Sequence, residues 1–407
     1  MTEDGSAVAK KATMGDPRKH YVELDALRGI AILCVVMFHT SGYWTATGVT
    51  LTIPRFGMDV MMNLLFFGTY GVSLFFLLSG YLLTWTEEKR ARSGSYTLRS
   101  YTLRRVLRIV PAYYVAIAIV VVLWPINVSV IDVLMHASFL HSFTPQARNS
   151  IDGVWWSLTP EVVFYCLLPL IVLKLPRVSQ RLALFGAFAL ISLALRLYAY
   201  VTEIVPNPTA PPSFSFSYVL GIATSFLYIF LAGVLLRMLV EYLNSRPESH
   251  LRLWLSWLAT IFFLIGAVSI VVLAYQGMKH PTLAAAQGEI PWLLIGIQVP
   301  FELIVIAFFA AGVLGSPLLR TVLKWRPLAF TGRISYSMFL LHNTVLVMVA
   351  TPYLVPALGD WVASQSSLLA VWVAFSGYVL VILTIVFTIS YLSYRYIERP
   401  FLSYKPK

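Results

Sequence analysis

Charged residues are scarce in this chain. Only 12% of its 407 residues are Asp, Glu, Lys or Arg, about half of the ~25% that is usual in soluble domains. At the same time 58% of the residues are apolar. This composition excludes a soluble globular domain, and it excludes a disordered chain, which has few apolar residues and much charge. The length is enough for about ten membrane-spanning helices of ~20 residues with their loops.

Cysteine is almost absent, and so are the short motifs that mark many cofactor and metal sites. Cys34 and Cys166 both fall in apolar segments, where they give no disulfide framework and no metal-ligand spacing. The sequence has no glycine-rich phosphate loop, no nucleotide fingerprint and no internal repeat. We therefore expect no metal and no permanently bound cofactor.

Long apolar runs make up most of the chain, and they predict an all-α membrane protein. Residues 1–20 are polar and basic and lack the apolar core of a signal peptide, so we expect a cytoplasmic N-terminal tail there. Residues 21–395 would form one transmembrane domain, and residues 396–407 a cytoplasmic C-terminal tail. The predicted spans are 24–44, 69–86, 106–124, 153–173, 182–201, 217–239, 251–275, 291–314, 334–357 and 367–394. The apolar stretch 131–143 is too short to span and suggests a re-entrant or interfacial piece, and the Pro-rich loop 203–216 an outer lid.

Positive charge is distributed unequally between the two sides of these spans. With ten spans and both termini inside, 25 of the 30 Lys and Arg residues fall in the tails and loops on one side. Cationic loops mark the cytoplasmic face of a membrane protein. The formal charge of +12 therefore predicts a multi-pass protein of the plasma or inner membrane, in contact with lipid, and does not indicate a nucleic-acid partner.

Arg28 and His39 lie in the first predicted span. Eleven residues separate them, so on a helix they share a face to within about 20° and lie about 16 Å apart along the axis. This places a fixed cation near the cytoplasmic end and a titratable base higher on the same face, an arrangement that suits a long anionic substrate. The alternatives are a snorkelling arginine and a histidine bonded between helices. Asp25, three residues before Arg28, would cap the helix or pair with Arg28.

Four more segments carry polar groups that the membrane interior disfavours. Gly71–Gly80 contains the small residues Gly71, Ser73, Ser79 and Gly80, which suit close helix packing or close approach of a ligand. The run Arg99, Arg104, Arg105 and Arg108 precedes Pro111 and either sets the topology or clamps phosphate. Gly153–Tyr165 places Glu161 inside a span with Tyr165 one turn later, after Trp156 and Ser157. Thr331–His342 contains Arg333, Ser335, Tyr336 and His342, and a lone histidine such as His342 often serves only as an interhelical hydrogen-bond partner.

Taken in order, these segments resemble the acyltransferase-3 family of integral membrane O-acyltransferases, which modify sugars and macrolides. The likeness rests on Arg28-x10-His39, on Gly71–Gly80, on the arginines before Pro111, on Gly153–Tyr165 and on Gly332–His342, and it covers residues 24 to about 345. The chain departs from the family pattern at Thr159-Pro160, which would shift the aim of Glu161.

The resemblance implies a cytoplasmic acyl-CoA donor, with acetyl-CoA as the first expectation, and a sugar-containing acceptor such as a polysaccharide, a glycolipid or a glycosylated natural product. It implies that His39 is the general base and that Glu161 either orients His39 or binds the acceptor. Arg28, Ser79, Arg99, Arg104, Arg105, Arg108 and Arg333 would hold the donor. Asp25, Trp156, Ser157, Tyr165, Ser335, Tyr336 and His342 would support the site or the acceptor. The competing interpretations are a secondary transporter, a flippase and a lipid-linked glycosyltransferase.

Overall fold

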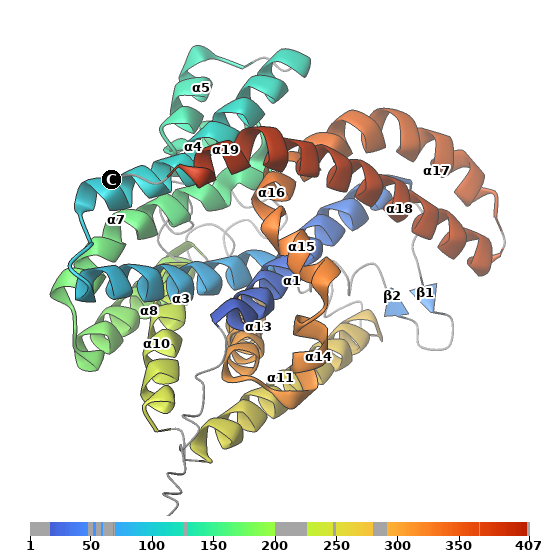
Figure 1. Cartoon of the computed structure of the whole chain (residues 1–407). Helices are drawn as coiled ribbons and strands as arrows, with labels where there is room; N and C mark the ends of the chain where they lie inside the picture. Colours follow the sequence, from blue (N-terminus) through green and yellow to red (C-terminus); the bar gives the residue numbers. More distant parts are fainter. Residues whose placement is uncertain are drawn as a thin grey trace, which may run out of the picture.

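The computed structural model describes residues 17–47, 52–53, 58–59, 68, 70–124, 128–199, 226–246, 250–279, 291–365 and 367–404. Within these residues the protein is helical (Figure 1), apart from a small antiparallel pair of strands, β1 (Thr52–Ile53) and β2 (Met58–Asp59). The prediction of an all-α bundle therefore holds for this part of the chain, with that one two-residue ladder added. The predicted lid 203–216 lies outside the described residues.

Each of the ten predicted spans contains a helix. These helices are α1 (Pro17–Trp44), α3 (Gly71–Arg92), α4 (Leu98–Leu123), α7 (Leu158–Lys174), α8 (Val178–Ala199), α10 (Leu227–Asn244), α11 (Leu251–Lys279), α13 (Pro291–Leu314), α16 (Ser335–Val345) and α18 (Leu368–Ser393). The start of the sixth predicted span, 217–225, lies outside the described residues. Helix α16 continues through the π-helix η6 (Leu346–Leu354) into α17 (Val355–Ala363), and α18 continues through the π-helix η7 (Tyr394–Glu398) into α19 (Arg399–Ser403).

Short helices fill several connections between the long ones. They are η1 (Thr45–Thr47), α5 (Val130–Ala137), η2 (His141–Phe143), α6 (Pro145–Arg148), η3 (Gly153–Ser157), α14 (Pro317–Leu323) and α15 (Arg326–Arg333). The apolar stretch 131–143 thus forms α5 and η2 and makes no span. The α5 side chains Val130, Ile131 and Leu134 are exposed.

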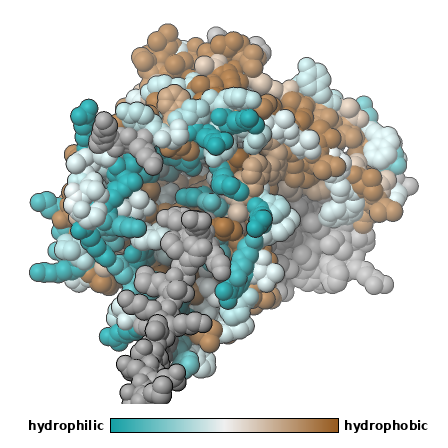
Figure 2. Space-filling view, viewed as in Figure 1, coloured by the Kyte–Doolittle hydropathy of each residue, from teal (hydrophilic) through white to brown (hydrophobic). Residues whose placement is uncertain are grey.

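Seven of the described helices are long and apolar enough to cross a membrane. An eighth is added if the bent pair 301–314 and Pro317–Leu323, which meet at 82°, is taken as one span. Side chains on the outside of the bundle are apolar as well, as on α18, where Leu369, Val373 and Leu380 are all exposed. In Figure 2 hydrophobic residues cover the surface over α5 and α18, whereas hydrophilic residues gather over α3 and α4. The protein is therefore a multi-pass membrane protein.

Helix α1 runs through the middle of the molecule (Figure 1) and packs against α3, α15 and α16. Glycines permit the closest of these contacts. A Cβ on Gly332 of α15 would lie 1.7 Å from the Asp25 carbonyl oxygen, and one on Gly29 of α1 would lie 2.2 Å from the Leu328 carbonyl oxygen. Such contacts are possible only without a side chain. They hold the N-terminal half of α1, with Arg28, at a fixed distance from the neighbouring helices.

Candidate functional site

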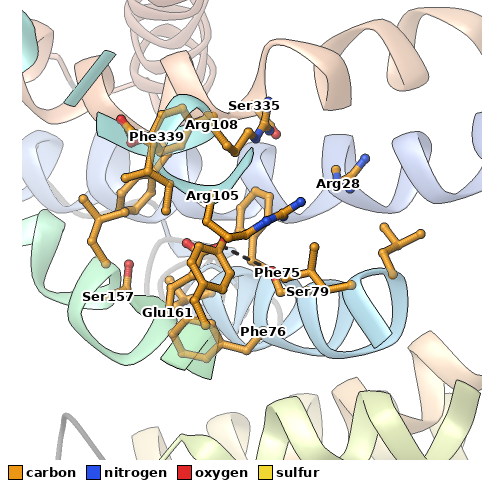
Figure 3. Close-up of a pocket in the computed structure, with 17 residues that line it drawn as sticks. Arg28, Phe75, Phe76, Ser79, Arg105, Arg108, Ser157, Glu161, Ser335 and Phe339 are labelled. Carbon is orange, nitrogen blue, oxygen red and sulfur yellow. Dashed lines mark hydrogen bonds between the residues drawn. The ribbon is translucent and has the colours of Figure 1, made fainter. Parts of the chain in front are cut away.

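A cavity of about 110 Å³, which we call the inner cavity, lies where the five helices α1, α3, α4, α7 and α16 meet. Helix α1 contributes Arg28, α3 contributes Phe75 and Ser79, and α4 contributes Arg105 and Arg108. The complete lining is Arg28, Val72, Phe75, Phe76, Ser79, Leu82, Leu83, Arg105, Arg108, Ile109, Ser157, Leu158, Glu161, Tyr165, Ser335, Tyr336 and Phe339. Figure 3 shows polar side chains from α1, α3, α4 and α7 around this space. Residues predicted from five separate segments of the sequence therefore meet in one place.

Glu161 is the carboxylate of this inner cavity. Its Oε1 accepts hydrogen bonds from the Tyr165 hydroxyl, one turn along α7, and from the Ser79 hydroxyl at 3.4 Å. The guanidinium groups of Arg105 and Arg108 also interact electrostatically with it. A carboxylate in a membrane bundle needs such partners, because an unpaired buried charge costs several kcal/mol (about 3–5 when one partner of a pair is removed). Tyr165, one turn after Glu161 in the sequence, is thus a hydrogen-bond partner of this carboxylate.

The arginines of the inner cavity each have an acidic partner. Arg28 forms the expected pair with Asp25, with 2.8 Å between Nη1 and Oδ1. Arg108 pairs with Glu398 of η7, and the second oxygen of Glu398 accepts a hydrogen bond from Ser337 at 3.0 Å. These pairs hold the guanidinium groups in place without burying unpaired charge.

Arg108 is in contact with Tyr336 of α16. Its guanidinium carbon lies 5.6 Å from the ring centroid of Tyr336, whose hydroxyl donates to the Ile109 carbonyl at 2.9 Å. Cation–π contact of this kind stabilises the charge by about 0.5–2 kcal/mol. Tyr336 is thus a fixed platform beneath the arginine.

A larger cavity of about 480 Å³, which we call the outer cavity, adjoins the inner cavity, and Arg105 and Arg108 line both. Its lining is Arg90, Ser95, Ser100, Arg104, Arg105, Leu107, Arg108, Phe401, Leu402 and Tyr404. The buried Glu87 carboxylate lies 2.8 Å from Arg104, 3.7 Å from Arg90 and 3.9 Å from Arg105. Three guanidinium groups thus share one carboxylate, which leaves an excess of positive charge at the wall of this outer cavity. Such a site favours an anion with several charges.

His39 and His342 lie against each other, with 3.2 Å between His39 Nδ1 and His342 Nε2. The hydrogen positions follow from their neighbours. His342 Nδ1 lies 3.1 Å from the Met338 carbonyl and 2.8 Å from the Phe339 carbonyl, so in the neutral ring it carries the hydrogen and Nε2 is an acceptor. His39 Nδ1 then donates to His342 Nε2 and to the Val35 carbonyl at 3.0 Å. This arrangement assigns the lone pair of neutral His39 to Nε2.

Phe339 adjoins both the inner cavity and this histidine pair. Its side chain lines the cavity, and its ring centroid lies 6.1 Å from that of His342. His39 itself does not line the cavity. The hydrogen bonds of Glu161 go to Tyr165 and Ser79, and those of His39 go to Val35 and His342. Within the described contacts, His39 is therefore hydrogen-bonded to His342 and not to Glu161.

Asp152 anchors the polar network at the far end of the histidine helices. It accepts hydrogen bonds from the Asn343 amide at 2.9 Å, from the Thr344 hydroxyl at 3.4 Å and from the Val154 backbone N–H at 3.1 Å. Burial raises the pKa of Asp152 to about 6, although these hydrogen bonds favour the ionised form. Tyr43 of α1 donates to the Asn343 Oδ1 at 3.3 Å, which connects the C-terminal ends of α1 and α16.

Some predicted site residues lie elsewhere. Arg99 and Arg333 are exposed and line neither cavity. Trp156 is half-buried against Phe226 and beneath Arg148, and it lies outside both linings. Arg99 and Arg333 belong to the basic run before Pro111 and to the Thr331–His342 segment, but their helical positions turn them outward. The described residues contain no group of three or more His, Cys, Asp or Glu side chains that would hold a metal.

Other residues of the site were missed by the sequence analysis. They are Phe75, Phe76 and Phe339 in the inner cavity, and Arg90, Glu87 and Glu398 around the arginines. Phe75, Phe76 and Phe339 lie inside the segments that we singled out, but apolar residues are ordinary in a span. The sequence holds one signal for Glu87 and Glu398, since each is an acidic residue close to several basic residues along the chain.

The model of the acyltransferase-3 family, described as an acyltransferase domain, matches residues 21–394. The chain belongs to this family. It is similar to the peptidoglycan O-acetyltransferase OatA of Listeria monocytogenes, with 27% identity over 163 residues, 38% of this chain and 21% of that protein. A Staphylococcus aureus (strain COL) protein named as an O-acetyltransferase is 25% identical over 93% of this chain and 56% of its own length. YrhL of Bacillus subtilis, named as a peptidoglycan O-acetyltransferase, is 26% identical over 81% of this chain and 49% of its length.

The chain spans about half the length of the last two relatives, since 56% and 49% of them are covered. No solved structure matches the chain. The family is therefore established by sequence, and the acyltransferase domain is the part that this chain shares with those proteins.

Proposed function

We propose that the protein is a membrane O-acyltransferase that moves an acyl group, acetyl in the first instance, from cytoplasmic acyl-CoA to a hydroxyl of a sugar-containing acceptor. Family membership supports the reaction class. The observation that carries the proposal is the arginine-lined pair of cavities next to a histidine whose Nε2 is left as the basic atom. The arrangement offers a place for a polyanionic donor and a base for the hydroxyl.

The donor would enter at the outer cavity. CoA carries phosphates at one end and the thioester at the other. Arg90, Arg104 and Arg105 present more positive charge than Glu87 neutralises, and arginine binds phosphate through two parallel hydrogen bonds. The pantetheine arm would then follow the inner cavity past Arg28 and Ser79. In this proposal the thioester reaches the histidine pair beside Phe339.

The reaction needs one base and no covalent enzyme intermediate. His39 Nε2 takes the proton from the acceptor hydroxyl, and the oxygen attacks the thioester carbonyl carbon. The carbon–sulfur bond breaks, and the imidazolium returns the proton to the departing thiolate, which leaves as CoA. His342 holds the Nδ1–H end of His39 throughout. Glu161, held by Tyr165 and Ser79, lies on the donor side and would position the thioester end of the donor or the acceptor.

The acceptor follows from chemistry and from the names of relatives. Two of the similar proteins are named as peptidoglycan O-acetyltransferases, so a peptidoglycan glycan strand is the first acceptor to test. We further propose ten spans in the plasma or inner membrane with both termini in the cytoplasm, which agrees with the charge of the loops.

The test uses the purified full chain in lipid nanodiscs with radiolabelled acetyl-CoA and peptidoglycan fragments. We expect labelled O-acetyl ester in the glycan with the unaltered protein and at most ~1% of that label with His39→Ala. The matched control is Cys34→Ala, a change on the same helix. CoA binding without transfer to any hydroxyl acceptor, or transport of a solute without CoA binding, would contradict the proposed function.

A further inference from the structure

One wall of the outer cavity is aromatic and apolar, and it has no role yet in the binding of phosphates by the arginines. Phe401, Leu402 and Tyr404 form this wall, at the end of the chain that follows the last long helix. Phe401 and Tyr404 are 42% and 62% exposed. What sets these two residues apart from other exposed aromatic residues is that they line the same cavity as Arg90, Arg104 and Arg105.

The position of this wall is fixed by an ion pair. Helices η7 and α19 pack against α4, and Glu398 of η7, which is 1% exposed, binds both Arg108 and Ser337. Phe401 and Tyr404 therefore line the same cavity of about 480 Å³ as Arg104 and Arg105. Pyrophosphate needs only the arginines. An aromatic wall beside an arginine cluster is the arrangement that binds a base and its phosphates together, because every base has a face that stacks on an aromatic ring.

We propose that Phe401 and Tyr404 form the base-binding wall of the outer cavity, which takes the adenine of a 3′-phosphorylated adenine nucleotide while the arginines hold its phosphates. This inference rests on the proposed function, because CoA carries such a nucleotide. It assigns the recognition of the nucleotide end of the donor to the C-terminal helix. The inner cavity is left to the pantetheine arm.

The experiment measures binding to the full chain in nanodiscs by calorimetry, without any acyl transfer. The probes are CoA, adenosine 3′,5′-bisphosphate, 4′-phosphopantetheine and inorganic pyrophosphate. Stacking of one base on one ring changes affinity by about ten-fold or more. We therefore expect Tyr404→Ala and Phe401→Ala each to weaken CoA and the bisphosphate by roughly ten-fold. Pyrophosphate and phosphopantetheine should bind as before, and Tyr404→Phe should bind all four normally.

The matched control is Tyr396→Ala. Tyr396 is an exposed ring of η7, 67% accessible, that lines neither cavity, so its loss should leave every affinity unchanged. Unaltered bisphosphate affinity in both alanine variants, or equal weakening of pyrophosphate, would overturn the inference while CoA binding to the unaltered protein keeps the proposed function. If the unaltered protein binds neither CoA nor the bisphosphate, the proposed function fails as well.

Discussion

The contact between His342 and His39 gives a prediction whose size follows from the geometry. His342 is fully buried, and its Nε2 accepts from His39 Nδ1 at 3.2 Å. The same Nδ1–H also lies 3.0 Å from the Val35 carbonyl. Replacement of His342 by Ala removes one of two acceptors, so the tautomer of His39 survives and only its orientation weakens.

A shared hydrogen bond of this kind contributes about 1 kcal/mol, and each ~1.4 kcal/mol of barrier is a factor of ten in rate. We therefore expect His342→Ala to lower kcat by roughly five-fold, with little change in KM for acetyl-CoA. His39→Ala, which removes the base, should lower kcat by about 10²–10⁴-fold. His342→Gln offers an amide oxygen to His39 Nδ1 and should recover most of the lost rate.

The assay is transfer of labelled acetyl groups at saturating donor and acceptor, with thermal unfolding of each variant measured beside it. A variant that unfolds early is compared at a lower temperature, so that stability and rate are separated. If His342→Ala is as inactive as His39→Ala while it remains folded, His342 takes part in the chemistry and the positioning role is refuted. If His342→Ala has the unaltered rate, the hydrogen bond between the two rings does not matter for catalysis.

Three further predictions test other parts of the structure. Arg105→Ala should raise KM for acetyl-CoA by about ten-fold or more through loss of a charged hydrogen bond. Arg99→Ala, at an exposed position outside both cavities, should leave KM unchanged. Equal effects of the two substitutions would contradict the placement of the donor in these cavities. Burial raises the pKa of Asp152 to about 6, so the folded state binds the proton of this carboxyl group more tightly than the unfolded chain does. The melting temperature should therefore fall as pH rises from about 4 to 6 and change no further above pH 6. The fall should be smaller in Asp152→Asn, and an identical pH profile in the two proteins would refute this prediction. Gly332→Ala should destabilise the fold by about 1–3 kcal/mol through overpacking, because its Cβ would lie 1.7 Å from a carbonyl oxygen, whereas Gly377→Ala, with nothing within 4 Å, should unfold at the same temperature or higher.

The helices of the bundle could be predicted from the sequence because a membrane span is recognised by the length and the apolar composition of its segment. The segment 367–394 matches α18 closely, and 24–44 has the same end as α1, which begins seven residues earlier at Pro17. The 82° turn after Leu314 into α14 and the continuation of α16 into a π-helix near Pro352 have no signal in the sequence. Both depend on how neighbouring helices pack, and a hydropathy pattern carries no information on packing.

The site was predicted in part for the same reason. Arg28, Ser79, Arg108, Glu161 and Tyr336 were singled out because polar groups in an apolar span are costly, and they meet in one cavity. Which of them touch was not predictable. The contact of His39 with His342 joins residues 303 positions apart, and no local pattern specifies such a pairing. Orientation was missed likewise at Arg333, which lies on the exposed side of α15.

The central claim is that His39 is the base that acts on a donor held by the arginines. The most direct test measures CoA binding and acetyl transfer on the same preparation of His39→Gln, which removes the basic nitrogen and keeps a polar side chain. The account predicts unaltered affinity for CoA together with a loss of transfer of about 100-fold or more. Transfer at the unaltered rate by folded His39→Gln protein would contradict it.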